Sequence, residues 1–250
     1  MTHEPYDPWS DERITAQVVD KYSRNQSGLS RSSSQLRLRL KRWAWRAVVR
    51  STYFIKRVFD IIASGIGILL LSPLFLFTWA AIKIEDPGPA IFKQERVGMW
   101  GKPFTMYKFR SMVMNAEALK DQLMEQNESG AGVIFKMKDD PRITKVGKII
   151  RKLSIDELPQ LFNVLFGDMS LVGPRPALPR EVAEYSVADR RRLDALPGIT
   201  CLWQIGGRSD IDFEGQVRLD VQYIQAQGFW NDFMIILKTV PAVLLGKGAY

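Results

Sequence analysis

The chain has 250 residues, a formal net charge of +8, one histidine and one cysteine. A single cysteine excludes an internal disulfide framework, and His3 alone argues against a histidine-based catalytic triad or a histidine-rich metal site. The positive excess predicts an anionic partner, either nucleic acid or anionic lipid. Because much of it lies beside a long apolar run, we favour lipid headgroups.

The first 55 residues divide into two predicted parts. Residues 1–34 are polar, and SRNQSGLSRSSS has no burial pattern, which predicts a disordered tail. Residues 35–55 begin with QLRLRLKRWAWRAVVR, which is basic, lacks acidic residues and interleaves Leu, Trp and Val. This pattern predicts an interfacial helix on anionic lipid, with a basic nucleic-acid arm as the alternative.

Residues 56–84 contain an apolar run, VFDIIASGIGILLLSPLFLFTWAAI, that is longer than the ~20 residues needed to cross a bilayer. Ser72 and Pro73 lie near its middle, and a proline there must kink or break the helix. The run is either a single transmembrane span or a re-entrant helix that enters and leaves by the same face. Basic residues flank both ends, including Arg57 and Lys83, which suits two cytoplasmic ends but leaves both alternatives open.

Residues 85–250 are sufficient for one compact domain. Alternation and turn residues in AIFKQERVGMWGKPFTMYKFRSM predict short strands with turns at Gly98 and Gly101. The other predicted elements are a helix at 113–131, a charged surface helix at 180–195, a loop or short strand in PGITCLWQIGGRS, and a membrane-facing helix at 229–245.

The most informative segment is RKLSIDELPQLFNVLFGDMSLVGPRP, residues 151–176. It sets two adjacent carboxylates, Asp156 and Glu157, between Arg151 and Arg175. Carboxylates beside guanidinium groups suit chemistry on a phosphate, because one carboxylate can attack phosphorus, another can hold a divalent metal, and arginines can offset phosphate charge.

An apolar helix follows the two carboxylates. Its apolar residues recur at helical spacing, at Leu158, Leu161, Phe162 and Leu165, and Gly167 ends the pattern. Ser154 with Glu157 three residues later has the form of a capping box. We therefore predict that Asp156 and Glu157 lie at a helix N-terminus, where the helix dipole keeps carboxylates ionised. The alternative is an ordinary helix cap with surface acids.

Several motifs occur in order: KRVFDIIAS, the Ser72-Pro73 pair, FKQERVG, YKFRSM, LSIDELPQLFNVLFGDMSLVGPRP, PGIT and GRS. Together they resemble the bacterial sugar transferases, the monotopic phosphoglycosyl transferases, from about Lys56 to the C-terminus. The resemblance implies an α+β, mostly α fold at the bacterial inner membrane. In it, a re-entrant membrane helix broken at Ser72-Pro73 precedes a small cytoplasmic catalytic domain, residues 85–250, with amphipathic interfacial helices.

The resemblance also implies an activity. Members transfer a hexose-1-phosphate from a UDP-sugar to polyprenyl (undecaprenyl) phosphate and release UMP, which initiates exopolysaccharide or other cell-surface glycan synthesis. It assigns Asp156 as the nucleophile of a covalent phospho-sugar intermediate and Glu157 as a ligand of Mg²⁺. The remaining implied residues are Arg151, Arg175 and Lys108 for phosphate binding, with Asp232 and Arg208 as further active-site candidates.

The C-terminal TVPAVLLGKGAY resembles the exopolysaccharide hexose-phosphate transferases, which favours UDP-glucose or UDP-galactose. We expect anionic membrane lipid and no nucleic acid as partners. The sequence is compatible with an oligomer as well as with a monomer. Two other functions compete with this one. A noncatalytic membrane scaffold would not need the acid pair between arginines, and an enzyme that transfers the sugar without its phosphate would release UDP instead of UMP.

Overall fold

The computed structural model describes residues 28–116, 118–119, 140–206 and 211–244. The chain divides into two compact units, Met1–Ile55 and Lys56–Tyr250, which we describe separately. The described part of the first unit is the beginning of helix α2 (Gly28–Glu85), which continues into the second unit. The helix therefore starts inside the predicted polar tail, and the helices predicted over 35–55 and 56–84 are continuous.

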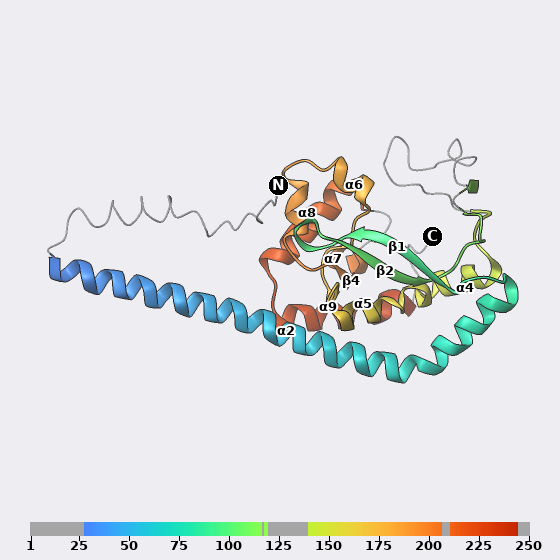
Figure 1. Cartoon of the computed structure of the whole chain (residues 1–250), viewed down its shortest axis with the longest axis horizontal. Helices are drawn as coiled ribbons and strands as arrows, with labels where there is room; N and C mark the ends of the chain where they lie inside the picture. The colour runs from blue at the N-terminus through green and yellow to red at the C-terminus, as the bar shows by residue number, and fades with distance from the viewer. Residues whose placement is uncertain (1–27, 117, 120–139, 207–210, 245–250) are drawn as a thin grey trace. The chain divides into compact units, whose positions relative to one another are not determined.

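The predicted break at Ser72-Pro73 does not interrupt α2, because both residues lie inside the helix. Figure 1 shows that α2 instead changes direction toward its teal C-terminal end. A proline removes one backbone donor, and the Ser72 hydroxyl donates to the Leu69 carbonyl at 2.8 Å, a contact that often accompanies helix bending. The residues from Tyr53 to Glu85 are long and apolar enough, by length and composition, to cross a membrane.

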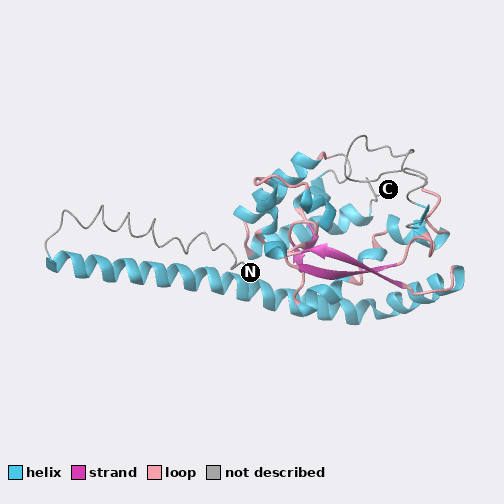
Figure 2. Ribbon diagram, turned by 45° about the horizontal axis from the view of Figure 1, so that its top comes forward, coloured by secondary structure: helices cyan, strands magenta, loops and turns pink. Residues whose placement is uncertain are grey.

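A β-hairpin follows α2. Strands β1 (Ile91–Val97) and β2 (Pro103–Phe109) pair antiparallel, with Ile91 opposite Phe109 and Val97 opposite Pro103. The 3-10 turn η1 (Met99–Gly101) joins them, and Gly101 has a φ of 78°, which favours glycine. The predicted strands and turns are thus confirmed, and Figure 2 shows the hairpin as two long magenta strands among helices.

The rest of the second unit is mostly helical, as predicted. Its elements are α4 (Lys145–Lys152), η3 (Ile155–Glu157), α5 (Gln160–Phe166), β3 (Ser170–Val172), α6 (Pro179–Ala183), η4 (Asp189–Leu193), β4 (Gly198–Thr200), α7 (Leu202–Gly206), α8 (Phe213–Gln225) and α9 (Phe229–Leu244). Strands β3 and β4 pair in parallel.

The parts of α2 on both sides of its proline lie against the same short helix, α5. On the N-terminal side, Arg57 donates to the carbonyls of Val164 and Leu165, at 2.5 and 2.8 Å, and so caps the end of α5. On the C-terminal side, the ring of Phe75 packs edge-on against Phe162, with centroids 6.0 Å apart. The apolar helix therefore stays beside the domain along much of its length.

The end of α2 is also tied to the domain. The carboxylate of Glu85 accepts the backbone N–H groups of Lys145 and Val146, at 2.7 and 2.8 Å, which satisfies free donors in the first turn of α4. Ile82, near the end of α2, belongs to a buried apolar cluster that includes Phe109 of the hairpin and Ile150 of α4. These contacts fix α4 and the hairpin relative to each other through α2.

The remaining predicted elements have different outcomes in the structure. The single helix predicted at 180–195 is wrong, because α6 and η4 are separate; the backbone N–H and hydroxyl of Ser186 both donate to Asp189, at 2.9 and 2.7 Å, and start a new turn. The stretch after Pro197 forms β4 and then α7. Most of the helix predicted at 113–131 lies outside the described residues, whereas the helix predicted at 229–245 is confirmed as α9.

Candidate active site

The two adjacent carboxylates lie on the turn η3 and not on the apolar helix. Ser154, just before this turn, has a φ of 55° and makes no capping bond through its side chain. A residue in this left-handed conformation typically follows the C-cap of a helix, so Ser154 lies directly after Leu153, the C-cap of α4, and does not cap α5. The predicted capping box is therefore wrong. Gly167, with a φ of 100°, ends α5 as predicted.

Glu157 contacts the hairpin through an ion pair. The Nζ atom of Lys108, on β2, lies 2.8 Å from Oε1 of Glu157. Burial alone would raise the pKa of Glu157, but Lys108, Arg175 and Arg96 outweigh it and hold that pKa below its ordinary value. Glu157 is therefore a carboxylate at neutral pH, as a metal ligand must be.

The pKa of Asp156 is shifted in the opposite direction. Burial, together with the negative charge of Glu157, raises the pKa of Asp156 to about 6, although Lys108 and Arg151 act to lower it. The group is mainly ionised at neutral pH, yet it is more basic than an ordinary aspartate. A partly desolvated and more basic carboxylate is a better nucleophile.

A pocket lies beside Glu157, and positive charge predominates in it. Its described lining residues are Arg96, Met106, Lys108, Glu157, Gln160, Arg175, Pro176, Gly198, Ile199 and Gln204. Three of them are cations, and Glu157 is the only acid among them. The guanidinium group of Arg175 lies 5.8 Å from the ring centroid of Trp203, so a cation–π contact supports it from one side. Such an arrangement can bind a multiply charged anion such as a diphosphate.

The donor set around the carboxylates also bears on a metal. Among the described residues, no three His, Cys, Asp or Glu side chains gather closely enough to hold a metal ion by themselves. Mg²⁺ is usually held by one or two carboxylates plus substrate phosphates, and not by a complete protein cage. Asp156 and Glu157 beside an anion pocket fit that pattern.

The structure brings together most of the predicted site residues. Lys108, Arg175 and Glu157 line the pocket, and the charge of Arg151, on α4, acts on the adjacent Asp156. Arg208 lies outside the described residues. Ser72 and Pro73 lie in α2, as described above.

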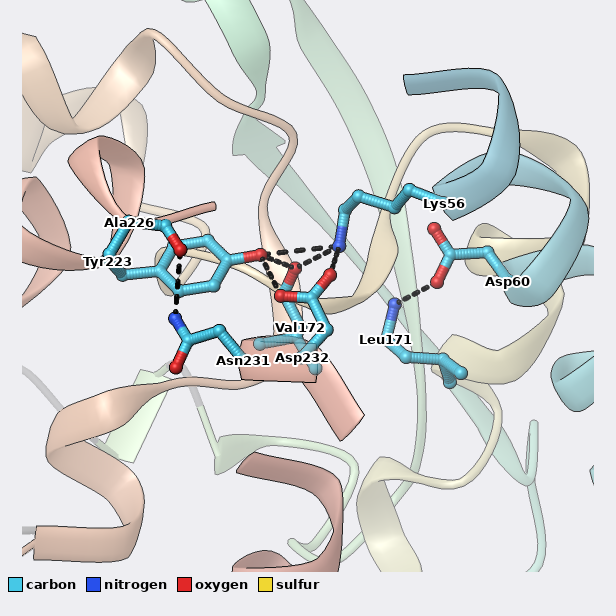
Figure 3. A network of polar contacts seen from close by, with 8 residues as sticks. All are labelled: Lys56, Asp60, Leu171, Val172, Tyr223, Ala226, Asn231 and Asp232. Atoms are coloured by element: carbon cyan, nitrogen blue, oxygen red, sulfur yellow. Dashed lines mark hydrogen bonds and ion pairs between the residues drawn. The ribbon is translucent and has the colours of Figure 1, made fainter. Parts of the chain in front are cut away.

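Asp232 belongs to a different cluster (Figure 3). Its Oδ2 atom lies 2.5 Å from Nζ of Lys56, and its Oδ1 atom lies 2.8 Å from the hydroxyl of Tyr223. Lys56 also donates to the carbonyl of Val172 at 3.0 Å. These contacts connect α2, α8, α9 and β3, and Asp232 is not among the described lining residues of the pocket. Its observed contacts are those of a residue that joins elements.

Arg96 and Gln160 are among the pocket residues that sequence reasoning missed. Both are buried, with 8% and 3% of their surface exposed. Arg96 lies at the end of β1, where alternation predicts which face is buried but not that a charged group occupies it. Gln160 lies three residues after Glu157, and this position was the only signal available.

The fold and the pocket together define a helical domain with an apolar helix at its side and a cationic site around two carboxylates. The family model described as "Bacterial sugar transferase" matches residues 51–246. The chain therefore belongs to the bacterial sugar transferase family, as the resemblance implied.

Individual relatives agree with the family. The chain is 53% identical to "Galactosyl transferase CpsE" of Streptococcus agalactiae and 47% identical to "Undecaprenyl-phosphate galactose phosphotransferase" of Salmonella typhimurium, over 78% and 80% of its length. The matches cover 43% of each of these relatives, so the chain spans less than half of their length. It is also 41% identical to "UDP-glucose:undecaprenyl-phosphate glucose-1-phosphate transferase" of Caulobacter vibrioides, over 78% of this chain and 72% of that protein.

Proposed function

We propose that the protein transfers a hexose-1-phosphate from a UDP-sugar to polyprenyl phosphate and releases UMP, which initiates a cell-surface glycan. The observation that carries this proposal is the pocket in which three cations face Glu157 beside a second, more basic carboxylate. A diphosphate repels a carboxylate unless its charge is neutralised, and these cations can neutralise it. A scaffold would not need such a site.

Asp156 is the nucleophile in this proposal. It attacks the phosphorus that bears the sugar, a carboxylate–phosphorus bond forms, and UMP leaves with the electron pair of the broken bond. The acceptor phosphate then attacks the same phosphorus and frees the carboxylate. Lys108 and Arg151, whose charges act on Asp156, would bind the sugar-bearing phosphate during both steps.

Glu157 would hold Mg²⁺ together with the substrate phosphates. The bound ion would supply positive charge to the leaving phosphate. Lys108 contacts Oε1 of Glu157 and so orients this carboxylate. This contact would hold Glu157 in place before substrate binds.

The names of the relatives support two donor sugars. One is named for galactose and another for glucose, so we propose UDP-galactose or UDP-glucose as the donor and undecaprenyl phosphate as the acceptor. The basic, aromatic composition of residues 35–55 supports anionic lipid as a further partner.

The decisive experiment is a nucleotide-release assay. The purified protein in lipid nanodiscs is incubated with undecaprenyl phosphate, Mg²⁺ and a panel of UDP-sugars. We expect UMP to form in step with the lipid product, and one equivalent of UMP plus a phospho-hexose adduct on Asp156 when the acceptor is left out. Release of UDP would indicate sugar transfer without phosphate, and no nucleotide release from any UDP-sugar would indicate a scaffold.

We further propose that α2 is re-entrant and that the catalytic domain is cytoplasmic. Asp60 and Thr78, on either side of Pro73, are both buried, whereas Leu69 and Phe77 are 73% and 72% exposed. A helix with one face on the domain and an apolar face exposed suits shallow insertion in one leaflet. A helix that crosses the bilayer would have to leave the domain.

Cysteine labelling tests this topology. Single cysteines at Ser34 and Asp86, in a Cys201→Ser background, are treated in intact cells with a membrane-impermeant thiol reagent. We expect both sites to be protected until lysis, because UDP-sugars are cytoplasmic. Labelling of one site in intact cells would show that the helix crosses the membrane, and labelling of both would place the domain outside.

A further inference from the structure

The charges of the pocket are not balanced in the described structure. Arg96 is 8% exposed, and among the described residues no carboxylate forms an ion pair with it. Its guanidinium group donates to the Pro176 carbonyl at 2.9 Å and to the amide oxygen of Gln94 at 2.6 and 3.1 Å, and both acceptors are neutral. Burial of a cation without a counter-charge is costly.

A second arginine increases this cost. Burial and then the charge of Arg175 lower the pKa of Arg96 to about 10, although Glu157 and Glu181 act in the opposite direction. Both arginines line the same pocket. Two cations that repel each other across a pocket are stabilised when an anion binds between them.

Gln160 provides an independent observation at the same place. It lines the pocket, and only 3% of its surface is exposed. A buried amide that borders a pocket can hydrogen-bond a ligand that binds there. Its amide N–H group could donate to a phosphate oxygen.

We propose that Arg96 and Gln160, with Arg175, form a subsite for the phosphate group of a phosphomonoester, and that two different substrates use it in turn. This inference rests on the proposed function. Its location follows from the pocket: Arg96, Gln160 and Arg175 line it together with Glu157, and Asp156 is not among its described lining residues. The subsite therefore lies on the Glu157 side of the nucleophile.

Double use of the subsite follows from the geometry of displacement. In phosphoryl transfer the attacking and leaving oxygens are roughly in line. When Asp156 attacks, the nucleotide phosphate leaves on the side opposite to Asp156. In the second step Asp156 is the leaving group, so the acceptor phosphate must attack from that same side. UMP and polyprenyl phosphate thus present the same phosphate group to Arg96 and Gln160.

The test measures binding of both phosphates to variants of these residues. In Gln160→Glu an isosteric carboxylate enters the pocket, while the contact of Arg96 with Pro176 is retained. Arg96→Gln removes the charge, Arg96→Lys keeps it, and Arg218→Gln on α8 is a matched control because Arg218 is exposed. The probes are UMP, uridine and farnesyl phosphate, titrated into nanodisc-embedded protein, with uridine reporting base contacts alone.

We expect Gln160→Glu and Arg96→Gln to weaken the binding of UMP and of farnesyl phosphate by about 10- to 100-fold, and to leave the binding of uridine unchanged. Arg96→Lys should recover part of the loss, and Arg218→Gln should bind both phosphates normally. Normal binding of UMP by Gln160→Glu would overturn the subsite. Weaker binding of UMP with unchanged binding of farnesyl phosphate would overturn the proposal that both substrates use it. If the unmodified protein binds both phosphates but releases no UMP from UDP-sugars, the proposed function fails while the subsite stands.

Discussion

Two kinds of charge cluster occur in the second unit, and they differ in the balance of positive and negative groups. In the pairs Lys56–Asp232 and Arg192–Asp220, nitrogen and oxygen lie 2.5 Å apart, and each joins elements distant in sequence. In the pocket beside Glu157, three cations share one acid. In a balanced pair each charge offsets the other, so loss of one partner destabilises the fold, whereas an excess of one sign attracts a ligand of the opposite charge. The difference separates structural charge from charge available for chemistry.

The largest expected effect is at the nucleophile. Asp156→Asn should lower turnover by at least about 10³-fold, because an amide cannot attack phosphorus. The same change should not lower the melting temperature, since burial already disfavours the charge of Asp156. Measurement of UMP release and of thermal unfolding on one preparation checks both statements. Turnover near that of the unmodified protein would remove Asp156 from the mechanism.

The reverse result is expected at a balanced pair. Asp220→Ala should lower the free energy of unfolding by about 3–5 kcal/mol, because it leaves Arg192 buried without its counter-charge. Arg192→Met combined with Asp220→Leu should recover much of this loss. Asp194→Ala, at an exposed position, is the control and should stay within about 0.5 kcal/mol. If Asp220→Ala lowers the free energy of unfolding no more than Asp194→Ala does, the pair of Arg192 and Asp220 does not stabilise the fold.

An intermediate effect is expected at the proposed metal ligand. Glu157→Gln should raise the Mg²⁺ concentration for half-maximal UMP release by about 10- to 100-fold, because a neutral amide replaces a negative ligand. A chelator should stop the unmodified enzyme, and added Mg²⁺ should restore it. Glu214→Gln is a suitable control, since Glu214 is exposed on α8 and is not among the described pocket residues. Full activity in excess chelator would contradict a metal requirement.

The sequence indicated those parts of the site and fold that depend on local pattern. Alternation and two turn glycines were enough for the hairpin, which places Lys108, and helical spacing up to Gly167 was enough for α5. Adjacent acids between arginines were enough to single out Asp156 and Glu157, which stay the predicted nucleophile and metal ligand. Each of these signals lies within a few residues of the feature it predicts.

The parts that could not be predicted depend on contacts distant in sequence or on a single backbone angle. The left-handed Ser154 moves the acids from a helix onto a turn, and no residue type requires that angle. Helix α8 was missed because its buried face includes Asp220, whose partner Arg192 is 28 positions away. The charge of Arg96 on a buried strand face becomes intelligible only once Arg175 and Glu157 are placed beside it.

The smallest expected effect is the pH dependence of a third balanced pair, Asp140 with Arg142, whose side chains hydrogen-bond at 2.7 and 2.9 Å. Burial would raise the pKa of Asp140, but the bonds from Arg142 outweigh it and lower that pKa. A lowered pKa stabilises the folded state above the ordinary aspartate pKa, and this stabilisation is lost as the pH falls through the lowered value. Asp140→Asn should therefore lower the free energy of unfolding by about 1–3 kcal/mol at neutral pH, and progressively less below about pH 4. Denaturant titrations of both proteins from pH 7 to pH 3 measure this, and a loss that does not change with pH would show that Asp140 acts through its shape and not through its charge.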